Sequence, residues 1–438
     1  MAHSAGSITS APVQYTFATR VFGSPHTPSL EALFHASSKA LTAPVEKLFL
    51  NESAATSALS RAAIPLAVSS LVTFSSDPTH QRRWERSASI TRTTTPDGAR
   101  PAAQANLQAL ARDLGACIAI PQLYGQDFLD RNPTLLSDLW TFDNDTFPLL
   151  LLGVPTWLPV KPMRDGLAAR ARIHAALEGV YRRARQARKG LPVDFGADVS
   201  DVSEVVRSRE RTYEAHGWSD EDMGKMEMGL FWGQNANTQP VVFWLLTYVY
   251  STPGLLARVR DEVAAYLTVE GGELVGVDVG GLARGCQLLR ACVFETYRLV
   301  NDASSIRYVA RPVTVADGER KHELRADSFF SALGSIENHD ASVYADPDRF
   351  DPERFLQRNP ETGESVARYG RLKPWGAGMA MCKGRTFAER EIMALGAAIF
   401  GIWDVEPVGG TWKVPERMPG TGVQKPVKDI RVLISRRK

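Results

Sequence analysis

One short segment near the C-terminus constrains the fold of this 438-residue chain more than any other. Residues 374–385 read PWGAGMAMCKGR, so a single cysteine, Cys382, lies in a glycine-punctuated loop, and a predicted helix, 386–400, follows directly. Glycines let a backbone approach a flat ligand closely because no Cβ intervenes. Turn amides and the positive end of a following helix stabilise a thiolate anion. The segment therefore predicts a loop that presents one thiolate to a flat cofactor.

A buried structural cysteine is the alternative interpretation of Cys382, since a free cysteine usually packs as a small apolar side chain. The second motif weighs against this alternative. Glu295 and Arg298 lie three residues apart on a predicted helix, 285–299, and share one helical face. Alone they would be read as an exposed ion pair, which is common and weak. Apolar neighbours on both sides predict that this pair is partly buried.

The third motif is a long predicted helix, 222–250, with an interruption at residues 237–240, Asn-Thr-Gln-Pro. Proline inside a helix removes a backbone donor and widens the turn, which frees carbonyls that can hold water. Thr238 supplies an alcohol at this point. Asn237 has two interpretations: its amide orients a water molecule, or it caps the kink, because asparagine readily bonds to local backbone groups.

Together these segments resemble the motifs of cytochromes P450, whose cysteine loop usually reads Phe-x-x-Gly-x-(Arg/His)-x-Cys-x-Gly. Gly378, Cys382 and Gly384 match that pattern. Trp375 stands where phenylalanine is usual, and Ala380 stands where arginine or histidine often holds a haem propionate. The resemblance is closest to fungal relatives of the group that contains sterol 7α-hydroxylases and prostacyclin synthase. Members of that group carry asparagine before the threonine of the interrupted helix and proline two residues after it.

The resemblance implies a mainly α fold with a small β region, the cytochrome P450 fold, around one haem b. Cys382 would be the axial ligand of the haem iron, and Arg307 would meet a propionate. In the Pro-Glu-Arg-Phe segment, 352–355, Arg354 would join Glu295 and Arg298 and fasten the proximal wall. The full set of expected cofactor-binding residues is Cys382, Arg307, Trp375, Gly376, Gly378 and Gly384.

The same resemblance assigns the expected catalytic and substrate-facing residues. Most relatives place an acid and an alcohol at the interruption, where they relay protons; here Thr238 keeps the alcohol and Asn237 replaces the acid. We expect both to position water. The expected substrate-facing residues are Phe231, Gln234, Asn235, Ala303, Ser304, Ser305, Gly420 and Thr421.

The implied function is a haem-thiolate monooxygenase. It would insert one oxygen atom of O2 into a lipophilic small molecule, such as a terpenoid, a sterol or a fungal secondary metabolite. Electrons would come from NADPH through the flavins of a cytochrome P450 reductase. Two alternatives stay open: an isomerase or dehydratase that acts on a peroxide without external electrons, and a haem-binding protein without turnover.

Composition restricts the partners. A net charge of +2 gives no case for nucleic acid binding. The four cysteines show no paired spacing for zinc or for a disulfide framework, which favours a reducing compartment. Basic residues around the cysteine loop either face an acidic reductase or only solubilise the surface, and we favour the first. These are Arg371, Lys373, Lys383 and Arg385.

We expect residues 1–14 to be disordered and residues 15–438 to form a single catalytic domain, which acts as a monomer. No run of about 18 apolar residues opens the chain. Compared with the family pattern, we therefore expect the membrane anchor and the first helix to be missing. The expected location is intracellular: the cytosolic face of the endoplasmic reticulum for the family, or the cytosol for a chain without an anchor, with association to a membrane surface left open.

Local patterns add four expectations about secondary structure. Weak alternation predicts a strand over 14–22, and apolar periodicity predicts a helix over 28–40. A second helix is predicted over 102–120. Residues 321–333 are expected to form a hairpin.

Overall fold

The computed structural model describes residues 6–302, 304–418, 420 and 422–437, and it is mainly helical with small sheets. This confirms the predicted fold class. The helices are α1 (Ala11–Thr16), α2 (Pro28–Phe49), α3 (Glu52–Arg61), α4 (Ile64–Ser69), α5 (Arg83–Ser87), α6 (Leu107–Ala119), α7 (Pro121–Tyr124), α8 (Gln126–Arg131), α9 (Leu135–Thr141), α10 (Phe147–Leu151), α11 (Lys161–Arg188), α12 (Glu204–Ala215), α13 (Asp220–Asn235), α14 (Thr238–Ser251), α15 (Leu255–Val263), α16 (Val279–Gly285), α17 (Gln287–Val300), α18 (Gly334–Asn338) and α19 (Arg385–Ile402).

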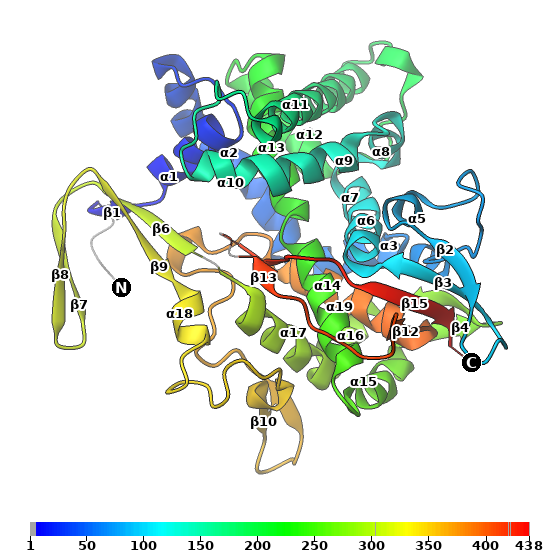
Figure 1. Cartoon of the computed structure of the whole chain (residues 1–438). Helices are drawn as coiled ribbons and strands as arrows, with labels where there is room; N and C mark the ends of the chain where they lie inside the picture. Colours follow the sequence, from blue (N-terminus) through cyan, green and yellow to red (C-terminus); the bar gives the residue numbers. More distant parts are fainter. Residues whose placement is uncertain (1–5, 303, 419, 421, 438) are drawn as a thin grey trace.

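The strands form two larger sheets and several hairpins. A four-stranded antiparallel sheet has the order β12-β15-β3-β2, and a three-stranded sheet has the order β1-β6-β9. Figure 1 shows these two sheets on opposite sides of the molecule, with α14, α17 and α19 between them. The strands are β1 (Ile8–Thr9), β2 (Thr91–Thr94), β3 (Pro101–Asn106), β4 (Leu267–Glu270), β5 (Glu273–Val277), β6 (Ser304–Val309), β7 (Val313–Asp317), β8 (Arg320–Leu324), β9 (Ser328–Leu333), β10 (Leu356–Arg358), β11 (Ser365–Ala367), β12 (Trp403–Pro407), β13 (Arg417–Met418), β14 (Lys425–Pro426) and β15 (Arg431–Arg436).

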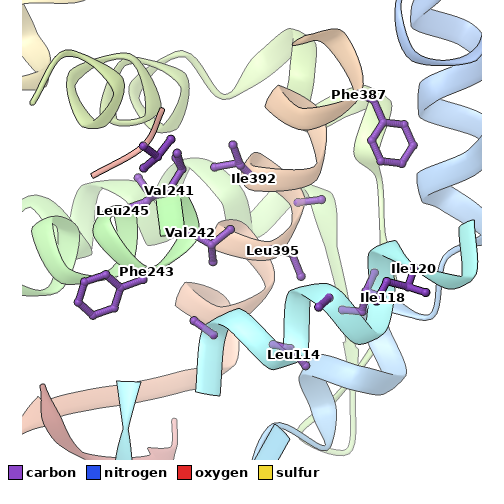
Figure 2. Packing of buried hydrophobic residues seen from close by; sticks show 14 of the residues in the cluster. Leu114, Ile118, Ile120, Val241, Val242, Phe243, Leu245, Phe387, Ile392 and Leu395 are labelled. Atoms are coloured by element: carbon purple, nitrogen blue, oxygen red, sulfur yellow. The ribbon is translucent and has the colours of Figure 1, made fainter. Parts of the chain in front are cut away.

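Helix α14 lies at the centre of the core. Its residues from Thr238 to Val249 are buried on every face, as expected for a helix that is apolar all round. It packs against α6, α17 and α19. Figure 2 shows side chains of α14, α6 and α19 gathered at this junction, among them Val242, Leu114 and Leu395. The centre of the fold is therefore the crossing of three helices that are far apart in sequence.

The predicted interruption of the long helix is confirmed. Helix α13 ends at Asn235 and α14 begins at Thr238. Pro240 lies in the first turn of α14, where a backbone amide would have no partner within the helix in any case. The proline therefore removes no helical hydrogen bond at the start of α14. Asn237 and Thr238, at the interruption, line an internal cavity.

The N-terminal region differs from expectation. Residues 14–21 belong to α1 and to a π-helical turn, Phe17–Val21, and not to a strand. The buried side chains of Tyr15, Ala18 and Phe22 follow a spacing of three and four residues, which is the period of a helix. Residues 8–14 are ordered as well, because β1 pairs with β6. The described part of the expected N-terminal segment 1–14 thus contains β1 and the first residues of α1.

Two further expectations were partly wrong. Residues 102–106 form β3, where alanines such as Ala103 pack without exposed surface between β15 and β2, so tertiary packing overrides their helix propensity. The predicted helix then follows as α6. Residues 321–333 contain two strands that do not pair with each other, since β8 pairs with β7 and β9 pairs with β6. The helix expected over 28–40 is confirmed and extends to Phe49 as α2.

The described part of the chain was compared with the length and apolar composition of a membrane-spanning helix. No single helix there combines the length and the apolar composition of a span. Residues Asp220–Ser251 and Leu255–Tyr266 reach both only when taken together, across a bend of 116°.

Gly115 on α6 provides a test of the packing at the three-helix crossing. A Cβ on Gly115 would overlap Oε1 of Gln239 on α14. We expect Gly115→Ala to lower the free energy of unfolding by about 1–3 kcal/mol through overpacking. Gly233→Ala is the matched control, because a Cβ on this helical glycine meets nothing within 4 Å. The control should be neutral or stabilise by up to about 1 kcal/mol through helix propensity. Denaturant unfolding of both variants measures the difference, and equal effects would contradict this account of the crossing.

Candidate functional site

The interrupted helix, the cysteine loop and β6 enclose a cavity of about 250 Å³. Its lining combines apolar and aromatic side chains with a few polar groups. The lining residues are Phe49, Gly233, Gln234, Asn237, Thr238, Val241, Tyr297, Asn301, Ser304, Ser305, Arg307, Pro374, Trp375, Gly376, Ala380, Cys382, Gly384, Phe387, Ala388, Glu391, Ile392, Gly422 and Val423. We call this space the first cavity.

The cysteine loop presents the thiol of Cys382 to the first cavity. The backbone amide of Cys382 donates to the carbonyl of Trp375 at 2.9 Å, and the amide of Gly384 donates to Sγ at 3.3 Å. Gly376 and Gly378 have φ angles of 76° and 69°, which favour glycine. The Cys382 side chain is exposed to the first cavity, because it forms part of the cavity wall. The loop thus holds one sulfur at the surface of an internal space.

Burial raises the pKa of the Cys382 thiol above its ordinary value. The amide of Gly384 and the charges of Arg385 and Lys383 act in the opposite direction, because they favour the thiolate. A bound metal cation would complete this stabilisation, since coordination deprotonates a thiol. The loop therefore supplies one amide and two cations that favour a thiolate at Cys382.

Trp375 forms another part of the cavity wall and is held in place by two aromatic residues. Its indole nitrogen donates to the hydroxyl of Tyr369 at 3.0 Å. The ring of Tyr297 lies edge-on to it, with centroids 5.0 Å apart. A flat group in the first cavity would therefore meet an indole that has little freedom to move.

Glu295, Arg298 and Arg354 meet as the motifs predict. Arg298 donates through Nε and Nη2 to both carboxylate oxygens of Glu295, each at 2.7 Å, and both side chains are fully buried. Arg354 lies 3.4 Å from the same carboxylate. Arg298 also donates to the carbonyl of Asn338 at 2.6 Å, and the amide of Asp351 donates to Glu295. This network fastens α17 to the segments that precede the cysteine loop.

Arg307 on β6 lines the first cavity and holds the cysteine loop. It donates to the carbonyl of Ala377 at 2.7 Å and to that of Ile306 at 2.8 Å. A guanidinium has five N–H groups, so donors remain for a carboxylate in the cavity.

The donor set of the first cavity fits a haem group. Haem requires one axial ligand for iron, flat apolar walls for the macrocycle and cations for its propionates. In this cavity Cys382 would supply the ligand, Arg307 would supply a cation, and Trp375, Phe49 and Phe387 would form aromatic walls. Of the expected cofactor-binding glycines, Gly376 and Gly384 line the first cavity and Gly378 does not.

The two expected catalytic residues have different environments. Thr238 is 7% exposed and lines the first cavity, and its hydroxyl makes no hydrogen bond to the residues that the structure describes. Asn237 instead accepts a hydrogen bond from the amide of Val423 at 3.1 Å. A Cβ on Gly422 would overlap that oxygen. Asn237 thus ties the helix interruption to the segment before β14, and it makes no side-chain cap bond to α14.

The expected substrate-facing residues divide into four groups. Gln234, Ser304 and Ser305 line the first cavity, and Gly420 lines a second cavity described below. Ala303 and Thr421 lie outside the described residues.

Phe231 and Asn235 are placed elsewhere than expected, because neither lines the first or the second cavity. Phe231 packs against the rings of Tyr124 and Phe128, and Asn235 donates to the carbonyl of Phe231 at 2.9 Å. Residues four apart share one helical face, and this face of α13 points away from the cavity.

A second cavity of about 410 Å³ adjoins the first and shares Asn237, Gly422 and Val423 with it. Its remaining walls are mostly apolar. They are formed by Asp143, Asn144, Phe147, Pro148, Leu151, Leu152, Trp232, Ala236, Met418, Gly420 and Lys425.

One ion pair, Asp143 with Lys425, lies in the wall of the second cavity. The indole of Trp232 donates to the same Asp143 carboxylate at 2.8 Å. Sequence reasoning missed all three residues. Asp143 and Lys425 lie 282 positions apart, and no local motif marks either of them.

The basic residues near the cysteine loop are partly neutralised. Lys383 pairs with Glu46 at 2.7 Å, and Arg371 pairs with Glu337 at 2.6 Å. Arg385 donates to the carbonyl of Cys382. The charge available for a partner on this face is therefore smaller than the sequence suggests.

Glu391 on α19 is a further wall residue that sequence reasoning missed. It is 1% exposed, but in the sequence it ends a charged triplet, Glu389-Arg390-Glu391, so no local signal marks it as buried. Burial raises the pKa of Glu391 from 4.5 to about 8.

This shift predicts a pH dependence of stability. Between pH 4.5 and 8 the unfolded chain releases the Glu391 proton and the folded chain retains it. The wild type should therefore lose stability relative to Glu391→Gln as the pH rises through this window, by up to about 1.4 kcal/mol per pH unit. Above about pH 8 the difference should level off. Urea unfolding of both proteins at several pH values provides the measurement, and parallel curves would contradict the buried acid.

This chain is similar to known proteins of one family. A model of the cytochrome P450 family matches residues 126–433. A cytochrome P450 monooxygenase of Gibberella zeae is 27% identical over 303 residues, which cover 69% of this chain and 55% of that protein. One from Penicillium oxalicum is 28% identical over 296 residues, 67% of this chain and 56% of that protein.

A mammalian relative belongs to the group that the motifs indicate. The 25-hydroxycholesterol 7-alpha-hydroxylase of Rattus norvegicus is 25% identical over 334 residues, 72% of this chain and 74% of that enzyme. The alignments with the two fungal relatives span little more than half of their length. These comparisons agree with the resemblance drawn from the motifs, including its relation to fungal proteins and sterol 7α-hydroxylases.

Proposed function

Since this chain belongs to the cytochrome P450 family, we propose that it acts as a haem-thiolate monooxygenase on a lipophilic small molecule. The observation that carries the proposal is the first cavity. There the thiol of Cys382 and the hydroxyl of Thr238 line one space that also fits haem. The names of the fungal and mammalian relatives support the same reaction class.

When bound, a haem with a thiolate ligand activates O2, because the axial thiolate donates electron density and favours O–O cleavage. The protein supplies binding, orientation and a path for protons. Cys382 would hold the iron and Arg307 one propionate, while Trp375 would restrain the macrocycle. Thr238 would hold water and donate a hydrogen bond into the cavity, and Asn237 would fix the helix interruption that exposes this hydroxyl.

The substrate would enter the second cavity. Its walls carry Phe147, Leu151 and Met418, which suit an apolar molecule such as a terpenoid, a sterol or a fungal secondary metabolite. The shared residues Asn237 and Val423 connect this space to the first cavity. An apolar body would thus lie in the second cavity while one carbon reaches the reaction site.

Electrons would come from NADPH through a flavoprotein reductase that docks near the cysteine loop. Of the four basic residues expected near the cysteine loop, Lys373 is exposed and forms no ion pair in the described structure. Complementary charge would steer the encounter and raise its rate. This face would be presented to the cytosol, where such reductases carry their flavins.

The test combines electron source and oxygen source. The haem-loaded protein, a fungal reductase and NADPH are incubated under ¹⁸O2 with a panel of terpenoids and sterols. We expect substrate-dependent consumption of NADPH and one ¹⁸O atom in the product. Turnover of a lipid hydroperoxide without NADPH, together with no oxygen incorporation from O2, would instead support the isomerase. Asn237, which gives the interruption an amide in place of an acid, is the feature that keeps this second candidate open. Normal haem content without either turnover would support a binding protein.

A further inference from the structure

An ion pair lies in the mostly apolar wall of the second cavity, where a purely apolar substrate would have no use for it. Asp143 and Lys425 are the only charged residues among the described residues that line this cavity. Their side chains are 4% and 19% exposed. Burial removes water from both charges, and an apolar pair of similar size is often equally stable. A charged pair at this place therefore indicates that the cavity recognises a polar group.

Three segments that are far apart in sequence bring the pair together. Asp143 lies on a π-helical turn, Phe142–Thr146, Trp232 lies on α13, and Lys425 begins β14. Turns of this kind are rare and are frequent at functional sites. The ring of Trp232 stacks on Phe147 with centroids 4.6 Å apart, and its indole nitrogen donates to Oδ1 of Asp143 at 2.8 Å. The carboxylate is thereby held in one orientation, in which Oδ2 meets Lys425.

The ammonium group of Lys425 has one donor to spare. Its Nζ donates to Oδ2 of Asp143 and, at 3.1 Å, to the backbone carbonyl of the same residue. An ammonium group has three N–H donors, and no other described residue accepts from this one. The lysine side chain is also the more exposed of the two. The third N–H is therefore available to a molecule in the second cavity.

The charge of the pair decides which kind of group this donor suits. Asp143 compensates the charge of Lys425, so the pair as a whole is neutral. A carboxylate in the cavity would accept from the ammonium group, but it would lie near the Asp143 carboxylate and would lose its own water in mostly apolar surroundings. A hydroxyl or ketone oxygen accepts the same hydrogen bond without either penalty. The pair therefore favours a neutral oxygen acceptor.

The position of the pair separates this oxygen from the reaction site. Asp143 and Lys425 line the second cavity and not the first, whereas Cys382 and Thr238 line the first and not the second. Asn237 is among the residues shared by the two spaces. A substrate that reaches both would thus have its oxygen at one end and the reacting carbon at the other.

We propose that Lys425 binds a hydroxyl or carbonyl oxygen of the lipophilic substrate, at the end remote from the carbon that is oxidised. The inference rests on the proposed monooxygenase function, because it names the substrate class of that site: a neutral terpenoid or sterol that already carries an oxygen. Lys425 contacts the substrate, while Asp143 and Trp232 are positioning residues that act through it. An earlier reaction must therefore have oxygenated the lipid before it reaches this protein.

Equilibrium dialysis of the haem-loaded protein, without NADPH or reductase, tests this recognition. Abietadiene, abietadienol and abietic acid share one skeleton and carry a methyl, a hydroxymethyl or a carboxylate group at the same carbon. β-Farnesene, farnesol and farnesoic acid provide a second skeleton. At pH 7.5, where the acids are ionised, we expect the wild type to bind an alcohol more tightly than the matching acid. Tighter binding of the acids, or no binding of either alcohol, would overturn the proposal.

Lys425→Met removes the donor and retains the length of the side chain. It should raise the Kd of the alcohol about tenfold or more, as expected for a hydrogen bond from a charged group, and leave that of the hydrocarbon within about twofold. Lys225→Met is the matched control. Lys225 pairs with Glu221, is 20% exposed and lines neither cavity. The control should bind all the probes as the wild type does.

A second variant guards against failure of the first to fold. Asp143→Asn keeps the size of the side chain and an acceptor for Trp232, but it leaves the charge of Lys425 without compensation. The acid should then bind about tenfold more tightly than it does to the wild type. Such a gain cannot come from a misfolded protein. Unchanged or weaker binding of the acid would overturn the proposal.

Binding and turnover fail independently. If Lys425→Met weakens the alcohol and the hydrocarbon equally, the ion pair only ties β14 to the helices and the inference fails, whatever the turnover. If the alcohol depends on Lys425 but no ¹⁸O enters a product, the proposed function fails, and the recognition of a neutral oxygen by Lys425 stands.

Discussion

Arg298→Ala is expected to lower the free energy of unfolding by about 3–5 kcal/mol, because it leaves the carboxylate of Glu295 buried with its main partner removed. Arg298 and Glu295 are both 0% exposed and share two hydrogen bonds at 2.7 Å. The variant also loses the bond to Asn338. The separate ion pair of Arg354 at 3.4 Å is too long to replace these contacts.

The chain offers a matched control for this prediction. Arg371 and Glu337 also form an arginine–glutamate pair, but their side chains are 71% and 40% exposed. Arg371→Gln should therefore change the free energy of unfolding by no more than about 1 kcal/mol. Chemical denaturation of both variants, followed by circular dichroism, gives the comparison. An equal loss of unfolding free energy in the two variants would show that the buried Glu295 network does not stabilise the fold more than an exposed ion pair does.

Cys382→Ser is expected to abolish NADPH-driven product formation while the protein remains folded. Serine preserves the size of the side chain and the loop contacts made by the backbone, but an alcohol at this position cannot provide a thiolate. Loss of the thiolate removes the electron donation on which O–O cleavage depends. Product analysis and the absorption spectrum of the haem-loaded variant are the measurements.

Cys117→Ser serves as the control for the cysteine substitution. Cys117 lies on α6, outside the walls of both cavities, and burial raises the pKa of its thiol to about 12. This variant should keep wild-type spectra and turnover. Full activity in Cys382→Ser, or an equal loss in Cys117→Ser, would contradict the assignment of Cys382 as the ligand.

The parts of the site that were predicted from sequence depend on local chemistry. The cysteine loop is one continuous segment, so its glycines, its thiol and the helix that follows can all be recognised from the sequence. Glu295 and Arg298 lie within one helical turn, so their contact follows from the helix itself. The interruption of the long helix was equally visible, because Pro240 marks it.

The parts that were missed depend on contacts between distant segments. Asn237 could cap the helix or orient water, and the structure shows a third role, a bond to Val423 that lies 186 positions away. The Asp143–Lys425 pair joins segments 282 positions apart. Glu391 ends the charged triplet Glu389-Arg390-Glu391 in the sequence, and only the packing of α19 against the rest of the fold shows that it is buried.

The errors in secondary structure have the same origin. Alanines favour a helix in isolation, yet residues 102–106 form an inner strand, because the sheet offers β15 and β2 as neighbours. For residues 14–22 the weak alternation was misleading, and the buried positions Tyr15, Ala18 and Phe22 follow the helical period instead. Burial, which sequence does not show directly, decided both cases.

The most direct test of the account is the absorption spectrum of the reduced, CO-bound protein after expression with haem. A strongly red-shifted Soret band, which is typical of a thiolate ligand, is the result that the geometry of Cys382, Gly384 and Trp375 predicts. A Soret band typical of a neutral proximal ligand, or a protein that binds no haem, would mean that the first cavity does not hold the cofactor through Cys382. The proposed oxygenation would then lose its basis.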